Sequence, residues 1–274
     1  MPADVPWLAR EVDDDELAAA IASYRERGYA LVPGVVSEEG LALLRARADD
    51  LMFGRSDGTP FFFQHDAATG RYEDAPLGEG WVGPSLEYRK IEKLERDPHY
   101  RAYLSNRLFE RIARAVLGED GITLYRAILM TKPARRPSVA GGTQLPWHQD
   151  GGLLWGLAAP PELQLWTALD DAPVAAGCMS VAVGSHHAGL ATQLGGAVPA
   201  EVVARTNVQT ELVPARAGDV VLLHNLAWHA SGLNETVHAR RAFSVCLLAA
   251  SNRCVRKRRA PREFPRIFAP GPSS

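Results

Sequence analysis

The second half of the chain is broken into short apolar runs separated by glycine, proline and aspartate, and this pattern limits the folds open to it. Residues 122–131, 162–169, 179–183 and 240–249 have the length and composition of strands rather than helices. Helical patterns dominate the first part of the chain instead. Helices followed by many short strands predict a mainly β fold with flanking helices, of the double-stranded β-helix (jelly-roll, cupin-like) class.

The N-terminal part predicts helices around a short strand. Residues 13–27 begin with acidic side chains, which suit the helix dipole, and the pattern ends at Gly28. A strand over 29–36 follows, and Ser37 is expected to cap a second helix. Residues 100–117 predict one further helix. This opening indicates a packing layer rather than a catalytic segment.

Length and composition fit one domain with a sizeable core. The chain has 274 residues, of which 46% are hydrophobic and 23% charged. We expect a single domain over 1–274, made of a helical N-terminal layer (about 1–120), a β-helix core (about 121–250) and a basic C-terminal tail (251–274). The strands 162–169 and 179–183 are expected to pair with each other.

Several classes of protein are disfavoured. Cys178, Cys246 and Cys254 are odd in number and lack C-x-x-C spacing, which indicates neither a disulfide framework nor a zinc cluster. A net charge of -2 gives no general attraction to nucleic acid. The sequence shows no run of eighteen apolar residues and no apolar segment at its N-terminus, so we expect no membrane partner and a cytoplasmic protein, monomeric or homodimeric.

The segment LPWHQDGG contains candidate metal ligands. Residues two apart in a strand point to the same face, so His148 and Asp150 would lie side by side with Gln149 turned away. His229 follows the apolar run 220–223, where a second strand could carry it across a sheet. Two histidines and one carboxylate favour Fe(II) and leave three coordination positions open.

An arginine pair follows the third candidate ligand. Arg240 and Arg241 begin a strand-like run, so one should point inward and the other outward. A guanidinium in the site could bind a carboxylate through two hydrogen bonds. The combination suggests a keto-acid co-substrate.

These residues resemble those of a known family. The stretches WHQDGG, LWTALDDAPVAAGCMSVAVGSH and GDVVLLHNLAWHASGLNETVHARRAF are similar to the phytanoyl-CoA dioxygenase family of Fe(II)- and 2-oxoglutarate-dependent oxygenases, over about residues 31–248. The resemblance implies a jelly-roll fold and iron ligation by His148, Asp150 and His229.

The same resemblance implies the co-substrate site. Arg240 would bind the distal carboxylate of 2-oxoglutarate with help from Ser231, and Arg241 is the alternative. Further implied contacts are Trp166, Gln149 and Lys90, of which Lys90 requires a one-residue gap in the comparison.

The implied activity is a dioxygenase reaction. With Fe(II), 2-oxoglutarate and O2, the family releases succinate and CO2 while it oxidises a small-molecule substrate, which family breadth suggests belongs to specialised metabolism. Related halogenases replace the carboxylate ligand by a small residue, so Asp150 favours hydroxylation. Desaturation, epoxidation or ring closure would use the same triad. A non-catalytic small-molecule binding protein and a Zn or Ni enzyme of cupin type are alternatives from other classes.

The roles of three further segments are left open by the sequence. The aperiodic stretch 54–84 could be a substrate lid with aromatic contacts or a surface loop anchored by core aromatics. Residues 190–208 could border the pocket mouth. The basic tail predicts a solvated arm, or else a segment that attracts a phosphate-bearing substrate such as a CoA thioester.

Overall fold

Strands from the whole length of the chain pair into two antiparallel sheets. The computed structural model describes residues 5–76, 80–136, 141–257 and 262–271. The larger sheet has eight strands, in the order β1-β10-β6-β12-β4-β3-β2, with β13 also paired to β4; the smaller has the order β8-β5-β11-β7-β9. The strands of the larger sheet are β1 (Tyr29–Val32), β2 (Phe62–His65), β3 (Tyr88–Glu92), β4 (Ile122–Lys132), β6 (Leu163–Ala168), β10 (Val220–His224), β12 (Arg240–Ala249) and β13 (Arg266–Phe268). The strands of the smaller sheet are β5 (Leu145–Gln149), β7 (Met179–Ala182), β8 (Gly196–Ala197), β9 (Thr210–Val213) and β11 (His229–Ser231).

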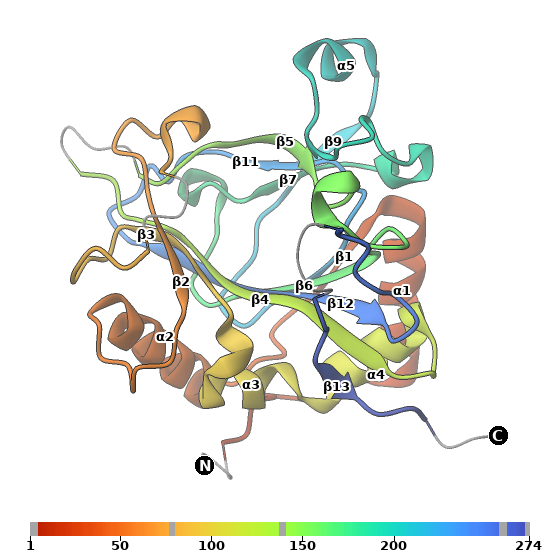
Figure 1. Cartoon of the computed structure of the whole chain (residues 1–274), viewed down its shortest axis with the longest axis horizontal. Coiled ribbons are helices and arrows are strands. Elements are labelled where there is room, and N and C mark those ends of the chain that lie inside the picture. The colour runs from red at the N-terminus through yellow and green to blue at the C-terminus, as the bar shows by residue number, and fades with distance from the viewer. Residues whose placement is uncertain (1–4, 77–79, 137–140, 258–261, 272–274) are drawn as a thin grey trace.

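The two sheets face each other, and helices cover the outer face of the larger sheet (Figure 1). These helices are α1 (Asp14–Arg27), α2 (Glu38–Met52), α3 (Pro98–Leu104) and α4 (Arg107–Leu117). A short helix, α5 (Ala200–Arg205), lies beside the smaller sheet. The prediction of a mainly β, cupin-like jelly roll with flanking helices is confirmed. No helix within the described ranges has the length and apolar character that a membrane span needs.

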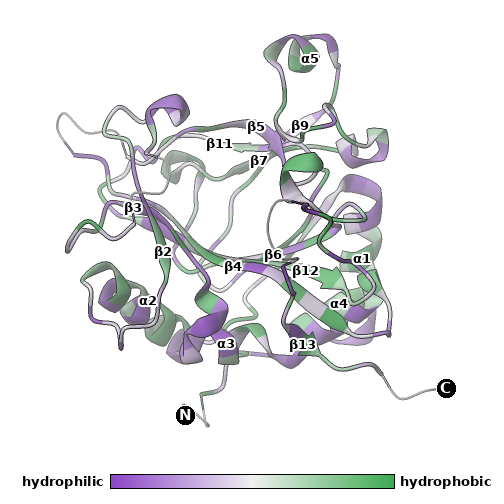
Figure 2. Cartoon of the chain, viewed as in Figure 1, coloured by the Kyte–Doolittle hydropathy of each residue, from purple (hydrophilic) through white to green (hydrophobic). Residues whose placement is uncertain are grey.

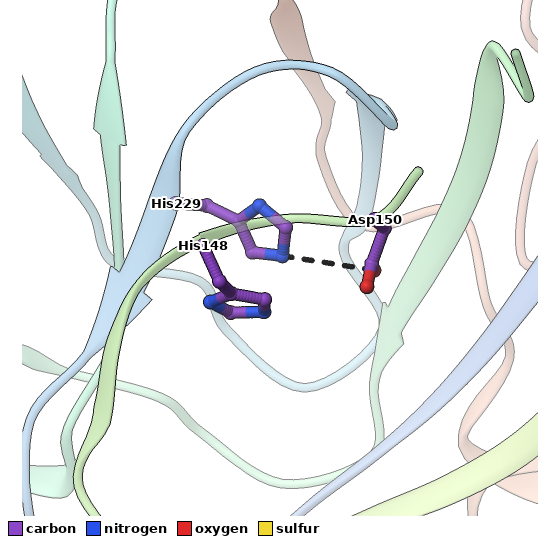
Figure 3. A group of neighbouring side chains, drawn as sticks. All are labelled: His148, Asp150 and His229. Atoms are coloured by element: carbon purple, nitrogen blue, oxygen red, sulfur yellow. Dashed lines mark ion pairs between the residues drawn. The ribbon is translucent and has the colours of Figure 1, made fainter. Parts of the chain in front are cut away.

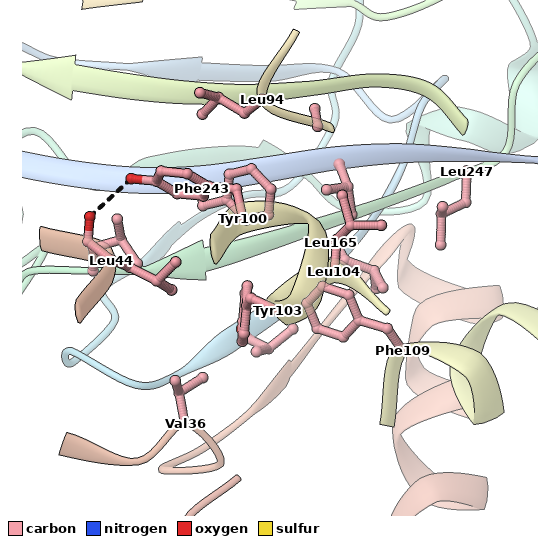
Figure 4. Packing of buried hydrophobic residues seen from close by; sticks show 14 of the residues in the cluster. Val36, Leu44, Leu94, Tyr100, Tyr103, Leu104, Phe109, Leu165, Phe243 and Leu247 are labelled. Carbon is pink, nitrogen blue, oxygen red and sulfur yellow. Dashed lines mark hydrogen bonds between the residues drawn. The ribbon is translucent and has the colours of Figure 1, made fainter. Parts of the chain in front are cut away.

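The larger sheet buries both of its faces, which is why its central strands are mainly apolar. On β12, Phe243 points to the helices and its neighbours in sequence point to the smaller sheet. Tyr100 of α3 packs on Phe243 with ring centroids 4.8 Å apart and donates a hydrogen bond to the Leu44 carbonyl at 2.9 Å (Figure 4). Figure 2 shows that the covering helices carry hydrophobic and hydrophilic residues on different sides. Because the helices cover only the outer face of this sheet, its inner face can border a cavity.

The helix predicted over 100–117 is two helices. Ser105 ends α3, and the side chain of Asn106 accepts a hydrogen bond from Phe109 N at 3.0 Å, which caps α4. Asp97 caps α3 in the same way. Asparagine side chains compete for backbone hydrogen bonds in this manner and favour helix starts. The helical spacing of apolar residues continues through Asn106, so that spacing alone did not reveal the break.

The predicted pairing of 162–169 with 179–183 is wrong. Strand β6 pairs with β10 and β12 in the larger sheet, whereas β7 pairs with β11 and β9 in the smaller one. The intervening segment crosses from one sheet to the other, with Gly177 in the left-handed region at φ 67°. Sequence neighbours in a jelly roll commonly alternate between sheets, and no local signal distinguishes this from a hairpin.

The described part of the C-terminal tail is not a free arm. Strand β13 pairs with β4, and Phe268 is buried in the main core. The Arg262 guanidinium lies over the Tyr125 ring at 4.8 Å. Earlier in the tail, Val255 N donates to the Gly156 carbonyl at 2.9 Å. Arg258 and Arg259 lie outside the described residues, so the attraction of a phosphate-bearing substrate stays a prediction.

His224 ends β10 and shapes the turn that leads to His229. Its Nδ1 accepts a hydrogen bond from Leu226 N at 3.1 Å, and its ring lies 4.7 Å from that of His186 and 5.8 Å from that of Tyr24. Burial, with a smaller contribution from His186, lowers the pKa of His224 to about 4. The imidazole is therefore neutral and structural, as the sequence suggested.

The His224 pKa predicts a pH dependence of stability. An unfolded histidine has a pKa of about 6.5, so between pH 6.5 and 4 the unfolded chain binds more protons than the folded one. The contribution is fully present above pH 6.5 and is lost as the pH falls towards 4, by up to about 3 kcal/mol. His224→Asn keeps an acceptor for Leu226 N and should flatten the pH dependence of the urea midpoint of the metal-free protein. Equal slopes for the two proteins would contradict this assignment.

Candidate metal centre

Three side chains from two segments meet on the inner side of the smaller sheet. His148 lies on β5, Asp150 follows the end of that strand, and His229 begins β11 (Figure 3). His229 and His148 are register partners, and their ring centroids lie 4.0 Å apart. One ligand atom from each of the three residues falls within 4.8 Å of the others. The structure thus brings together the three residues that the sequence singled out.

Backbone carbonyls orient both imidazoles. His148 Nδ1 lies 2.9 Å from the Pro146 carbonyl, and His229 Nδ1 lies 3.0 Å from the Ala227 carbonyl. A carbonyl only accepts, so each Nδ1 carries the proton and each Nε2 offers a lone pair. Burial, and then the adjacent His148, lower the pKa of His229 to about 4. Both features suit neutral imidazole ligands.

Asp150 is held by two donors from the opposite sheet. Arg126 Nη2 of β4 lies 2.9 Å from Asp150 Oδ2, and Gln164 Nε2 of β6 donates to the same oxygen at 2.6 Å. Burial alone would raise the pKa of this carboxyl, but the charges of Arg126, His229 and His148 hold it well below its usual range. Oδ2 also lies 3.8 Å from His229 Nε2, so the ionised carboxylate adjoins the imidazoles and can share a metal ion with them.

The Arg126 guanidinium is itself fixed by aromatic rings. It lies 4.4 Å from the centroid of Trp155, and Trp155 stacks on Tyr125 at 4.6 Å. Sequence reasoning missed both Arg126 and Gln164. The available signal was a polar residue at an inward position of an otherwise apolar strand, in ITLYRAILMTK and LQLWTA.

A cavity of about 250 Å³ opens beside the triad, and one end of it is lined by Arg240, Ser231 and Trp166. Arg240 is only 4% exposed, and its Nη2 donates to the Gly177 carbonyl at 2.7 Å. Its Nε, and the hydroxyl of Ser231, are buried without a hydrogen-bond partner in the described part of the chain. Burial lowers the pKa of Arg240 to about 10, so the side chain stays charged at neutral pH.

Arg241 points the other way. Its Nε and Nη1 pair with Asp170 at 2.8 Å and Asp49 at 2.7 Å on the helix side of the sheet. Strand alternation required one arginine of the pair to point inward, and the structure places Arg240 there. The alternative assignment of Arg241 to the site is therefore disfavoured by position.

The remaining predicted contacts differ in their positions. Trp166 borders the cavity and lies under the Arg240 guanidinium at 5.6 Å. Lys90 also borders it, 3.6 Å from Glu92, and burial lowers the pKa of Lys90. Gln149 borders the cavity too, but its amide binds backbone groups, with Nε2 donating to the carbonyls of Gly189 and Leu226 and Oε1 accepting from Ala191 N. That position favours an anchoring role.

The two candidate mouth segments both reach the cavity. In the stretch 54–84, Tyr72 lines the cavity, whereas Phe63 is buried in the main core on β2. The aromatic cluster around Phe63 is thus an anchor, and residues 77–79 lie outside the described ranges. In the stretch 190–208, Gly196 and Ala197 of β8 line the cavity.

The donor set fits a divalent metal ion and a dicarboxylate. Neutral imidazoles with one ionised carboxylate are the ligands that Fe(II) accepts in open sites. The buried, unpartnered hydroxyl of Ser231 and Nε of Arg240 are costly as they stand and would be satisfied by a carboxylate.

The Arg126–Asp150 pair predicts a measurable coupling. Asp150→Ala should lower the free energy of unfolding of the metal-free protein by about 3 kcal/mol, because it leaves a largely buried guanidinium without its counterion. Adding Arg126→Met should recover about half of that loss or more. Both variants should fail to bind metal ions tightly, which serves as the control. If the loss of unfolding free energy in the double variant equals the sum of the losses in Asp150→Ala and Arg126→Met, measured by urea unfolding, the pair is not coupled.

Comparisons with known proteins agree with this geometry. Compared with solved structures, the chain aligns with the epimerase SnoN from nogalamycin biosynthesis, solved with Fe3+, alpha ketoglutarate and nogalamycin RO, at a TM-score of 0.70 and 20% identity, covering 95% of this chain and 97% of that one. It also aligns with EctD from S. alaskensis, solved with 2-oxoglutarate and 5-hydroxyectoine, at a TM-score of 0.67 and 20% identity, over 91% of this chain and 83% of that one. At these identities the likeness establishes the fold.

Sequence relatives define the family. The mouse phytanoyl-CoA dioxygenase domain-containing protein 1 is 26% identical over 217 residues, which are 74% of this chain and 69% of the mouse protein. The family model described as phytanoyl-CoA dioxygenase (PhyH) matches residues 24–242, which include the triad and Arg240. With that match spanning most of the chain, the protein belongs to the phytanoyl-CoA dioxygenase (PhyH) family of Fe(II)- and 2-oxoglutarate-dependent oxygenases.

Proposed function

We propose that this protein is an Fe(II)- and 2-oxoglutarate-dependent dioxygenase that hydroxylates a small molecule. The observation that carries the proposal is the juxtaposition of an intact His148–Asp150–His229 group with a buried, incompletely hydrogen-bonded Arg240 in one cavity. A non-catalytic binding protein would not need all of these groups to be intact. Both relatives solved with 2-oxoglutarate or alpha ketoglutarate have this fold.

The residues divide the work between two ends of the cavity. His148, Asp150 and His229 would hold Fe(II) through two Nε2 atoms and one carboxylate oxygen, a ligand set typical of open iron sites. Arg240 and Ser231 bind the distal carboxylate of 2-oxoglutarate, since they hold the buried donors that lack partners. When bound, the iron and its co-substrates supply the oxidising chemistry, and succinate and CO2 are released.

Trp166 and Trp155 enclose this site. Trp166 is 6% exposed and packs along Arg240, so the distal carboxylate would sit in surroundings that exclude water. Trp155 is 9% exposed and covers Arg126 at the other end. Charge-assisted hydrogen bonds strengthen when water is excluded, which favours tight binding of a dicarboxylate in a small cavity.

The carboxylate ligand favours hydroxylation over halogenation. Asp150 occupies the position that halide would need, and its two donors from the larger sheet hold it there. Hydroxylation is also the outcome suggested by the 5-hydroxyectoine in the EctD structure. Because SnoN is an epimerase on the same fold, product analysis is the step that separates hydroxylation from epimerisation or ring closure.

The first test is succinate formation. Anaerobically reconstituted Fe(II) protein, exposed to O2 with 2-oxoglutarate, should form succinate, and a true substrate should stimulate it and gain one oxygen atom by mass spectrometry. His148→Ala, Asp150→Ala and His229→Ala should each lower the rate by at least about a thousandfold, because each removes a metal ligand. Absence of both succinate and calorimetric binding of 2-oxoglutarate would refute the proposal.

Arg240 and Arg241 form a matched pair for the co-substrate site. Arg240→Met should weaken 2-oxoglutarate binding by about a hundredfold, because a charge-assisted pair is lost in a buried site. Arg241→Met should leave that affinity unchanged while destabilising the fold, because its ion pairs to Asp170 and Asp49 lie outside the cavity. Calorimetric titration of the anaerobic Fe(II) protein measures the first effect and urea unfolding the second. The reverse pattern would reassign the contact to Arg241.

A further inference from the structure

The cavity holds more positive charge than the metal site and the co-substrate need. Five cationic side chains line it, whereas Asp150 is the lining carboxylate. The lining cations are Arg89, Lys90, Arg126, Lys132 and Arg240. Two further carboxylates act from behind the wall, Glu92 on Lys90 and Asp66 on Lys132. Five cations against three carboxylates leave a surplus of two positive charges, and Fe(II) with the 2-oxoglutarate dianion adds no net charge to it.

The surplus is concentrated at Arg89 and Lys132. Arg126 is paired with Asp150 and Lys90 with Glu92, at 2.9 and 3.6 Å. Within the described ranges, Arg89 and Lys132 have no carboxylate oxygen within 4.0 Å. Arg240, the other cation without such a pair, is assigned to the co-substrate above.

Lys132 is a buried cation without a direct ion pair in the described ranges. It is 5% exposed, and its Nζ donates one hydrogen bond, to the Thr143 carbonyl at 2.5 Å. Burial, and then the charge of Arg240, lower the pKa of Lys132 well below its usual value, while the charge of Asp66 acts in the opposite direction. A buried ammonium group in these surroundings is stabilised by an anion placed in the cavity.

Arg89 lies on the adjacent strand β3, and its guanidinium is also incompletely hydrogen-bonded. Its Nη2 donates to Gln64 Oε1 at 3.2 Å, its Nε is buried without a partner, and its guanidinium lies 5.6 Å from the Tyr72 ring. The charge of Arg89 acts on Lys132 as a like charge, which indicates that the two groups lie in one neighbourhood. Together they offer several free N–H donors to one ligand.

Part of the remaining wall is apolar. Leu154, Trp155 and Met179 line the cavity, and Leu153, Leu154 and Leu194 form an exposed apolar patch at 58–69% exposure. Leu154 N donates to the Leu194 carbonyl at 3.2 Å, so the patch is continuous across two segments. A ligand that satisfies both halves of the wall carries one anionic group and an apolar body.

We infer that the substrate is an organic anion with an apolar body, and that its carboxylate or phosphate-type group binds to Arg89 and Lys132. The inference rests on the proposed function, since it names the class of substrate for the same site. It assigns specificity to two residues outside the metal ligands and the proposed co-substrate contacts. A neutral substrate would leave Lys132 buried without a directly paired anion.

The test compares matched probes. Calorimetric titrations of the anaerobic Fe(II) protein, saturated with 2-oxoglutarate, would use 4-phenylbutyrate and its neutral analogue 4-phenylbutyramide. We expect the acid to bind at least about tenfold more tightly, because charge-assisted hydrogen bonds replace an uncompensated charge. Arg89→Gln and Lys132→Met should each remove this preference without weakening the amide, whereas Arg89→Lys should retain part of it.

Controls separate the possible failures. Arg205→Gln removes an exposed cation on α5, outside the cavity lining, and should leave the preference unchanged. If Lys132→Met does not fold, the comparison of the wild type with Arg89→Gln and Arg89→Lys still tests the inference. Equal binding of acid and amide by the wild type, with normal 2-oxoglutarate-dependent succinate formation, overturns this inference and leaves the proposed function intact. Absence of 2-oxoglutarate binding, with the acid preference still dependent on Arg89 and Lys132, refutes the function and retains the anion site.

Discussion

The ion pair between Arg126 and Asp150 joins the two sheets at the point where the chemistry is placed. Arg126 belongs to the larger sheet and Asp150 follows a strand of the smaller one, so their 2.9 Å contact spans the interior of the jelly roll. Removing such a pair from water is costly unless the remaining polar atoms are satisfied. Gln164 satisfies one of them and Trp155 covers the guanidinium, which explains why these residues lie on neighbouring elements.

This pair also determines how the metal ligands are presented. Both donors bind Oδ2 of Asp150, and both imidazoles are turned by carbonyls that fix their Nδ1 atoms. The ligand atoms are therefore preorganised before any metal ion binds. The larger sheet supplies charge and hydrogen bonds, and the smaller sheet supplies the ligands. This division explains why the cationic side chains that line the cavity all come from the larger sheet.

Local patterns predicted the elements of this fold better than their connections. Strand alternation foretold that one of Arg240 and Arg241 must point inward, and the spacing of His148 and Asp150 foretold a shared face. Neither pattern could show which sheet a strand joins, because a crossing between sheets and a hairpin have similar turn residues; the pairing assigned to 162–169 failed for this reason. Arg126 was missed because its partner Asp150 lies 24 residues away, after a strand of the other sheet, and an isolated cation in an apolar strand gives only a weak signal.

Gln149 illustrates how strand alternation assigns roles within one motif. The residues on either side of it turn to the cavity, so its own side chain must leave by the opposite face. There it binds Leu226, which lies in the turn before His229, and also the backbone near Gly189 and Ala191. Gln149 therefore ties the strand of the first histidine to the turn that delivers the second. Its place inside the ligand motif follows from positioning the ligands, and its contact with the co-substrate stays a prediction.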